Sequence, residues 1–119
     1  MIEKLGIGID IVDIQKFKKL PYNSNKIFYK KVFHDSEINY CLKFKNPYEH
    51  FAGKFALKEA VKKSISKQID FLDILTIHKS SKPLVYLKNK IYKFEVSITH
   101  DKDISVAIVI SEKIGNDSK

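Results

Sequence analysis

The sequence predicts an α+β fold, in which one long central helix packs on a mainly antiparallel sheet. Helical spacing of apolar residues dominates the first half of the chain, and residues 71–110 break into short β-type runs separated by turn residues. The 119 residues, 44% of them hydrophobic, suit one domain with a real core. We assign residues 1–114 to that domain and expect a frayed tail over 115–119.

Residues 5–14 form a β-branched run with two glycines, which predicts a buried strand whose backbone passes close to another element. Asp10 is anomalous there, because a carboxylate in a covered strand usually caps a turn or binds a cation. Asp13 stands where a helix N-cap is expected. Helical spacing then continues until Pro21 stops it.

Two further helices are expected before the central one. The first covers residues 23–32, although its Tyr and Phe residues fit a strand equally well. The second begins at Asp35-Ser36-Glu37 and ends at Asn46-Pro47. The residues expected to point inward are Ile27, Phe28 and Val32 in the first helix, and Ile38, Cys41 and Leu42 in the second.

Residues 47–66 predict the longest helix, because the segment has no internal proline and its apolar residues recur with helical spacing. Glu59 and Lys63 fall on the arc expected to face the interior. Burying ionisable groups without partners costs several kcal/mol, so this pair should have a counter-charge or a use. The same i,i+4 spacing also fits an ordinary Glu-Lys pair on a solvent-exposed surface.

The second half predicts strands at 71–78 and 84–87, joined by the turn-like Ser80-Ser81-Lys82-Pro83. A hairpin over 94–99 and 104–110 closes around residues 100–103. His100 therefore ends a strand at a loop, which is a common place for a side chain that acts on a ligand.

The formal charge of +8 arises from 22 Lys and Arg against 14 Asp and Glu. It favours an anionic partner, although a lysine-rich surface can also be merely solvated. The aromatic residues do not alternate with basic ones as in an RNA-binding strand, so we expect no nucleic-acid partner. Lysines and acids interrupt every apolar stretch, so we expect no membrane span.

The single cysteine, Cys41, excludes an internal disulfide and a cysteine-based zinc site, and no leader pattern precedes the first strand, so we expect a cytoplasmic protein. Nothing in the chain resembles a P-loop or the Gly-x-Ser-x-Gly elbow of serine hydrolases. If Asp10 and Glu59 converge, their two carboxylates would suit Mg²⁺.

Three segments in order resemble the holo-[acyl-carrier-protein] synthase family, the short single-domain phosphopantetheinyl transferases. They are Gly6-Ile7-Gly8-Ile9-Asp10-Ile11-Val12-Asp13-Ile14, Phe51-Ala52-Gly53-Lys54-Phe55-Ala56-Leu57-Lys58-Glu59-Ala60-Val61-Lys62-Lys63, and Val96-Ser97-Ile98-Thr99-His100-Asp101. The resemblance implies the phosphopantetheinyl transferase fold and Mg-dependent transfer of 4′-phosphopantetheine from coenzyme A to a serine of an acidic apo-acyl carrier protein. It also implies release of 3′,5′-ADP, a role in fatty acid biosynthesis, and a homotrimer with active sites at subunit interfaces.

Carried over position by position, the resemblance implies roles for eleven residues. Asp10 and Glu59 would bind the metal, and Lys63 would act on the departing phosphate. The general base stays open, with a water relayed through Glu59 or Asp10 as one possibility. The coenzyme A contacts would be Lys54, Lys58, Lys82, Pro83 and His100, and the carrier would dock on Lys16, Lys18 and Lys19.

Two departures from the family pattern affect these contacts. Lys54 stands where an arginine is usual, which keeps the charge but loses the bidentate fork. Ser81 replaces a glycine before Lys82 and Pro83, so the geometry of that turn is an open question.

Overall fold

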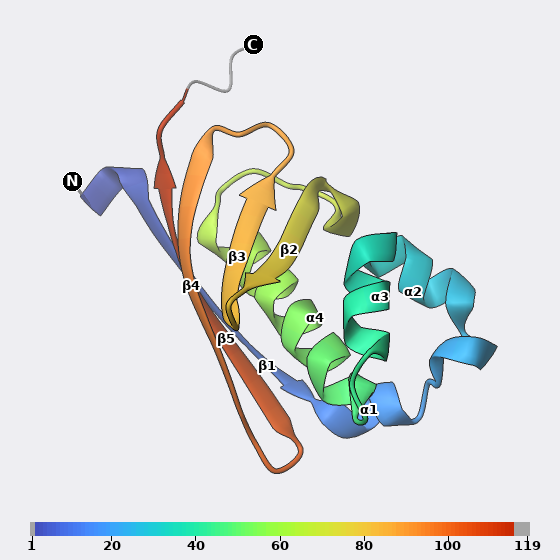
Figure 1. Ribbon diagram of the computed structural model, residues 1–119. Helices are drawn as coiled ribbons and strands as arrows, with labels where there is room; N and C mark the ends of the chain where they lie inside the picture. The colour runs from blue at the N-terminus through green and yellow to red at the C-terminus, as the bar shows by residue number, and fades with distance from the viewer. Residues whose placement is uncertain (1, 116–119) are drawn as a thin grey trace.

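The computed structural model describes residues 2–115, and a layer of helices lies against one face of a three-stranded sheet, with a two-stranded sheet beside it (Figure 1). The tail expected over 115–119 lies, apart from Gly115, outside the described residues. Among the helices of residues 2–115, none is both long and apolar enough to cross a bilayer.

Within residues 2–115, the four α-helices fall close to the expected segments, whereas the strand predicted over 71–78 begins only at Ile74, because residues 71–73 form a 3-10 helix. The α-helices are α1 (Ile14–Lys18), α2 (Lys26–Val32), α3 (Asp35–Leu42) and α4 (Pro47–Ser64), and the 3-10 helices are η1 (Ile2–Lys4), η2 (Tyr22–Ser24) and η3 (Phe71–Asp73). Asp13 caps α1 as predicted, because its side chain accepts a hydrogen bond from the backbone N–H of Gln15 at 3.0 Å.

The strands form two antiparallel sheets. The strands are β1 (Leu5–Asp13), β2 (Ile74–Lys79), β3 (Lys82–Leu87), β4 (Tyr92–Asp101) and β5 (Ile104–Lys113). The larger sheet has the order β1-β5-β4, and β2 pairs with β3. The register places Asp10 opposite Ala107 and His100 opposite Ser105. His100 thus lies within β4 rather than in the loop after it, because the hairpin turn is shorter than the sequence suggested.

Strand β1 lies directly on α4, and its two glycines make this approach possible. A Cβ atom added at Gly6 would lie 1.7 Å from the carbonyl oxygen of Ser64, and one at Gly8 would lie 1.9 Å from that of Ala60. Both distances are far below van der Waals contact, so no side chain fits there. The predicted close backbone approach is confirmed.

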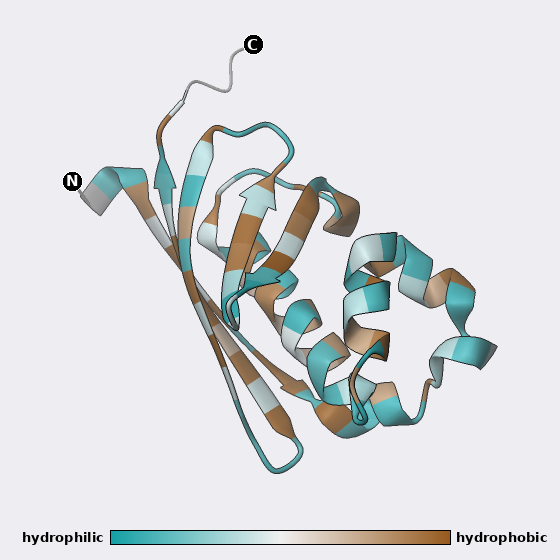
Figure 2. Cartoon of the chain, viewed as in Figure 1, coloured by the Kyte–Doolittle hydropathy of each residue, from teal (hydrophilic) through white to brown (hydrophobic). Residues whose placement is uncertain are grey.

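The outer face of the larger sheet is apolar and exposed. Helices cover only the inner face, and hydrophobic residues alternate along the long strands (Figure 2). The prediction of a buried strand holds for only one face of β1, because Ile7 and Ile11 on the other face are 66% and 64% exposed. The exposed apolar residues of this face are Leu5, Ile7, Ile9, Ile11, Ile104, Ile108 and Ile110.

Aromatic rings from α1, α2 and α4 fill the core beside the helices. The Tyr29 and Phe51 rings pack edge to face at 4.7 Å, and the Tyr29 hydroxyl donates to the carbonyl of Leu20 at 2.6 Å. The expectation that Ile27 points inward was wrong, because it is 77% exposed and Tyr29 takes the inward position of α2. Leu42 at the end of α3 is also exposed, contrary to expectation, whereas Cys41 is buried.

Candidate active site

Two pockets lie on opposite sides of α4. The first, here called the carboxylate pocket, has a volume of about 380 Å³, and the second, here called the histidine pocket, about 170 Å³. The carboxylate pocket is lined by Asp10, Ile11, Val12, Asp13, Lys16, Phe17, Leu20, Phe28, Phe55 and Glu59. The histidine pocket is lined by Glu49, His50, Gly53, Lys54, His78, Ser81, Pro83, Ile98, His100 and Ser105.

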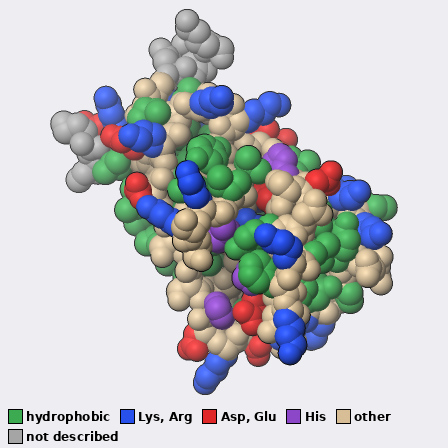
Figure 3. Space-filling model, viewed as in Figure 1, with side chains coloured by type: hydrophobic (Ala, Val, Ile, Leu, Met, Phe, Trp, Pro, Cys, Tyr) green, Lys and Arg blue, Asp and Glu red, His purple; other side chains and the backbone are tan. Residues whose placement is uncertain are grey.

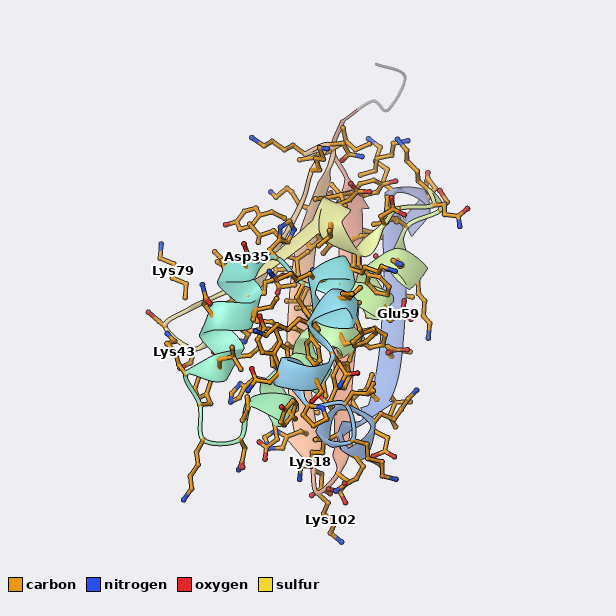
Figure 4. All side chains as sticks on the ribbon, turned by 90° about the vertical axis from the view of Figure 1, so that its right-hand side faces the viewer. Lys18, Asp35, Lys43, Glu59, Lys79 and Lys102 are labelled. Carbon is orange, nitrogen blue, oxygen red and sulfur yellow. The ribbon has the colours of Figure 1, made fainter. Side chains whose placement is uncertain are left out.

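The helical turn explains this separation. At about 100° per residue, the mean direction of the α4 residues in the histidine pocket is roughly opposite to that of Phe55 and Glu59. Histidine side chains gather on the face of the molecule shown in Figure 3. Figure 4, turned toward α1 and α2, shows Glu59 on the part of α4 that lies beside β1.

The packing of β1 on α4 brings Asp10 and Glu59 to one pocket. Gly6 packs against Ser64, and Gly8 packs against Ala60. The next inner-face residue of β1, Asp10, therefore lies over the preceding turn of α4. That turn carries Glu59, and both carboxylates line the carboxylate pocket. The side chain of Asp10 is 15% exposed, so it is mostly withdrawn from bulk water.

Lys63 completes this group from the next turn of α4. Its Nζ donates to Oδ1 of Asp10 at 3.0 Å and to the carbonyl oxygen of Ile9 at 3.1 Å. The ion pair of Lys63 in the described part of the chain is therefore with Asp10, and the alternative of a surface pair with Glu59 is not what the structure shows. The Lys63 side chain is 57% exposed, so its ammonium remains accessible to a ligand.

The donor set of the carboxylate pocket fits a hard divalent cation. Asp10 and Glu59 offer carboxylate oxygens, and Mg²⁺ typically takes one or two protein carboxylates and fills its shell with water and substrate phosphates. Residues 2–115 hold no cluster of three or more His, Cys, Asp or Glu side chains suited to a metal ion. A closed all-protein metal cage is thus not built here, whereas a two-carboxylate site is compatible with the residues present.

Lys54 lies at the bottom of the histidine pocket and is 1% exposed. Its Nζ donates to Thr76 Oγ1 at 2.9 Å and to the Thr76 carbonyl at 3.4 Å, and lies 3.4 Å from His78 Nδ1. Burial lowers the pKa of Lys54 below its usual value. The β2 strand therefore fixes this ammonium in one place beside the pocket.

The buried Glu37 carboxylate accepts four hydrogen bonds, two of them from Thr76, and so holds the partner of Lys54 in place. Its oxygens accept from Lys58 at 2.8 Å, from the His34 N–H at 2.7 Å, and from the Thr76 N–H and hydroxyl, both at 2.7 Å. Burial opposes ionisation, but the Lys58 charge and these hydrogen bonds hold the pKa of Glu37 below its usual value. Because the Thr76 hydroxyl donates to Glu37, it must accept from Lys54, which fixes the orientation of the whole chain of groups.

Lys58 lies in the interior and lines neither pocket. Its ammonium donates to Glu37 and to the carbonyl oxygens of Val32 at 2.8 Å and Phe71 at 3.3 Å. All three donors are thus used by protein groups. The structure does not bring Lys58 together with the other expected coenzyme contacts, because its ammonium is held by α3 and η3 in the interior.

His78 was missed by the sequence reasoning. Its ring stacks on Tyr40 at 4.8 Å with an interplanar angle of 6°. Burial and the nearby charges of Lys54 and His50 lower the pKa of His78 to about 4, so the imidazole is neutral at pH 7. Since the Lys54 ammonium can only donate, Nδ1 of His78 accepts and Nε2 carries the hydrogen. No spacing in the sequence connects His78 to α4, and only the folded β2–β3 hairpin reveals the contact.

The rim of the histidine pocket holds the remaining expected contacts. His100 Nε2 lies 3.4 Å from Glu49 Oε1, and the His100 side chain is 55% exposed. Pro83 lines the pocket, and Lys82 is exposed on the same hairpin without lining it. His50, another residue missed by the sequence reasoning, stacks on Phe44 at 3.7 Å.

The three lysines expected to meet a protein partner are all exposed on or next to α1. Lys16 also lines the carboxylate pocket, and Lys18 projects from the α1 region in Figure 4. Lys19 is the C-cap residue of this helix. A positively charged surface thus adjoins the pocket that holds Asp10 and Glu59.

Comparison with known proteins gives consistent results across sequence and structure. A family model described as the 4′-phosphopantetheinyl transferase superfamily matches residues 6–109. A holo-[acyl-carrier-protein] synthase of Thermodesulfovibrio yellowstonii is 37% identical over 113 residues, which cover 92% of this chain and 98% of the relative. One from Clostridium tetani is 39% identical over 121 residues, covering 91% and 95%.

Solved structures of similar proteins include coenzyme A complexes. The Helicobacter pylori holo-[acyl-carrier-protein] synthase in complex with coenzyme A is 35% identical, with a TM-score of 0.76 and coverage of 89% of this chain and 99% of that one. The Bacillus anthracis holo-(acyl-carrier-protein) synthase in complex with CoA (3′,5′-ADP) is 30% identical, with a TM-score of 0.79 and coverage of 91% and 96%. The predicted fold class is thereby confirmed.

Proposed function

The chain belongs to the holo-[acyl-carrier-protein] synthase family of the 4′-phosphopantetheinyl transferase superfamily, and from this premise we propose its reaction in detail. It transfers 4′-phosphopantetheine from coenzyme A to a serine of apo-acyl carrier protein and releases 3′,5′-ADP. The reaction takes place in the cytoplasm and supports fatty acid biosynthesis. The observations that support the proposal are that Asp10 and Glu59 line one pocket and that the Lys63 ammonium pairs with Asp10.

Asp10 and Glu59 would hold Mg²⁺ through their carboxylate oxygens. When bound, the ion neutralises charge on the coenzyme A pyrophosphate as the carrier serine attacks the phosphorus that bears pantetheine. The same carboxylates can also accept the proton of the serine, directly or through a water, so they are our candidates for the general base.

Lys63 acts on the leaving phosphate. Its ammonium is held beside Asp10 by a 3.0 Å ion pair, and its exposed side chain can turn toward a ligand in the pocket. An ammonium in this place stabilises the negative charge that develops on 3′,5′-ADP and can supply a proton to it.

The histidine pocket binds coenzyme A phosphates. Lys54 supplies a fixed positive charge at its base, His100 and Pro83 form its rim, and Lys82 on the exposed hairpin approaches from outside. The neutral His78 adds an N–H donor to the same wall. The coenzyme A complex of the similar Helicobacter pylori protein supports a coenzyme site on this fold.

The acidic carrier docks on Lys16, Lys18 and Lys19. These exposed lysines adjoin the carboxylate pocket, so a carrier held on them presents its serine to Asp10 and Glu59. Opposite charges on the two surfaces raise the encounter rate and make it sensitive to salt.

The protein assembles as a homotrimer with active sites at subunit interfaces. One coenzyme A molecule that touches both the carboxylate and histidine pockets would have to reach around α4, because these pockets lie on opposite sides of that helix. A carboxylate pocket of one copy facing a histidine pocket of the next avoids this difficulty. The exposed apolar face of the larger sheet gives such an assembly a surface to bury.

One assay tests the proposed reaction. The protein is incubated with coenzyme A, Mg²⁺ and apo-acyl carrier protein, and the carrier is weighed by mass spectrometry. We expect the carrier to gain the mass of 4′-phosphopantetheine, and chelation of Mg²⁺ to stop the gain. Asp10→Ala and Glu59→Ala should each lower the rate at least about 100-fold while circular dichroism stays unchanged. An unmodified carrier with wild-type protein would rule the proposal out.

A further inference from the structure

Ser105 carries a buried hydroxyl that the fold itself does not use. The residue is 0% exposed, and its Oγ has no hydrogen-bond partner within residues 2–115. Buried hydroxyls are almost always hydrogen-bonded, because removing one from water without a partner costs about 1–3 kcal/mol. An unused hydroxyl in the core therefore calls for a physical reason.

The reason lies in the position of this residue. Ser105 stands on the inner face of β5, opposite His100, and lines the histidine pocket together with Lys54. Gly53 of α4 leaves the space near it open, since a Cβ atom there would lie 3.6 Å from the Ser105 Oγ. The hydroxyl is thus withdrawn from solvent at the base of a pocket, under a helix position that has no side chain.

Ser111 shows that the same strand satisfies a buried hydroxyl where a partner is within reach. Ser111 lies on the same inner face of β5 and is 1% exposed. Its Oγ donates to the carbonyl oxygen of Ser64 at 2.9 Å. The two serines therefore differ in one respect that matters here: only Ser105 lines the histidine pocket.

The charges around the pocket decide what Ser105 can bind. The Lys54 ammonium is buried there, and the acidic group of the pocket, Glu49, lies 3.4 Å from the imidazole of His100. The three N–H bonds of Lys54 are directed to Thr76 and His78, so Lys54 contributes positive charge and Ser105 contributes the hydrogen-bond donor. Together they suit an anionic oxygen. The volume of about 170 Å³ admits a phosphate group but not a whole nucleotide.

We propose that Ser105 is a further co-substrate-binding residue, whose hydroxyl donates a hydrogen bond to a phosphate oxygen of coenzyme A in the histidine pocket. This inference rests on the proposed function, and it adds a contact that the sequence motifs do not indicate. The hydroxyl takes part in binding only and forms no covalent bond with the ligand. It stays unpaired in the free protein so that the donor is already in place when the phosphate arrives.

A matched pair of variants tests the proposal. Ser105→Ala and Ser111→Ala each remove one buried hydroxyl from the same face of β5. Coenzyme A binding is measured by isothermal titration calorimetry, and the melting temperature is measured with and without coenzyme A. The Ser105→Ala variant should bind coenzyme A about 10-fold more weakly or worse, because it loses a hydrogen bond to a charged group. The Ser111→Ala variant should bind coenzyme A with the wild-type affinity.

Without coenzyme A, the melting temperatures should show that Ser111→Ala, and not Ser105→Ala, is the damaging change. Ser105→Ala should melt at or above the wild-type temperature, because it removes an unpaired buried group, and Ser111→Ala should melt lower, because it leaves the Ser64 carbonyl without its partner. Steady-state kinetics should show a raised KM for coenzyme A and an unchanged KM for the carrier in Ser105→Ala. Wild-type affinity for coenzyme A in this variant would overturn the inference. Failure of the wild-type protein itself to bind coenzyme A would instead reject the proposed function.

Discussion

The ammonium of Lys63 lies 3.0 Å from the carboxylate of Asp10, across a separation of 53 residues in sequence. The contact joins the last turns of α4 to the middle of β1, and it depends on the two glycines that let this strand lie on the helix. The ion pair is largely open to solvent on the lysine side, so its contribution to stability is small, and in the proposed mechanism Lys63 acts on the leaving phosphate.

We expect Lys63→Ala to slow transfer without unfolding the protein. The turnover number should fall about 100-fold or more, because an aimed positive charge at the leaving phosphate is lost, while the KM for coenzyme A changes little. The free energy of unfolding should change by less than about 1 kcal/mol. Lys62→Ala is the matched control, since the Lys62 ammonium lies over the Phe71 ring, whereas the ammonium of Lys63 pairs with Asp10. A turnover number unchanged in Lys63→Ala would remove this residue from the reaction.

Charge reversal at the end of α1 should weaken binding of the carrier protein and leave binding of coenzyme A unchanged. Replacing Lys18 and Lys19 by glutamate should raise the KM for the carrier at least about 10-fold, since attraction becomes repulsion. Lys16 is left unchanged in this variant, because it also lines the carboxylate pocket. The KM for coenzyme A should stay within about twofold of the wild-type value. The rate of the variant should depend less on salt concentration than the wild-type rate does. Equal carrier KM values for both proteins would place the docking surface elsewhere.

Lys58→Met should destabilise the fold rather than impair coenzyme binding. The change leaves the Glu37 carboxylate buried without its cation, and breaking such a pair costs about 3–5 kcal/mol. Urea unfolding gives the free-energy change, and the double variant with Glu37→Gln should lose less than the sum of the two single changes. If Lys58→Met kept wild-type stability and bound coenzyme A more weakly, Lys58 would again be a candidate coenzyme A contact.

Alanine at two glycines should have opposite effects on stability. Gly8→Ala places a methyl group against the Ala60 carbonyl and should destabilise the protein by at least about 2 kcal/mol, because backbone must move. Gly53→Ala meets only ordinary contacts, at 3.4 Å from Ile98, and should stabilise α4 by about 0.5–1 kcal/mol. Thermal unfolding of both variants checks this, and the reverse order would contradict the packing of β1 on α4.

The His78 imidazole should stay neutral at pH values well below the usual pKa of histidine. Its pKa is lowered from 6.5 to about 4 in the folded protein, so the unfolded chain binds the proton more readily. The stability contribution of the neutral form is therefore complete above about pH 6.5 and is lost as the pH falls toward 4. NMR of the imidazole nitrogens should report the Nε2–H tautomer at pH 7, and a midpoint near 6.5 would disprove the buried, lysine-bound arrangement.

The sequence could predict α4 and the close approach of β1, because both leave strong local patterns of periodicity and paired glycines. It could not place Lys58, since its partner Glu37 lies on another helix and only folding brings them together. Ile27 was assigned inward from the pattern of apolar residues in this helix, but the Tyr29 ring is buried there instead and its hydroxyl donates to the carbonyl of Leu20.

The meeting of Asp10 and Glu59 was implied by the family motifs and not by spacing, because nothing local connects a strand residue with one 49 positions later. His50 and His78 were missed for the same reason, as each acquires its role from a neighbour distant in sequence. Contacts between distant segments are thus the part of the site that only the structure reveals.

The opposite placement of the carboxylate and histidine pockets on α4 has a genetic consequence. If neighbouring copies share each active site, a chain with Asp10→Ala and a chain with Lys54→Ala are each inactive alone, yet a mixed assembly regains sites built from the intact half of each. Two defective alleles in one cell would then complement one another, whereas two lesions in the same pocket would not.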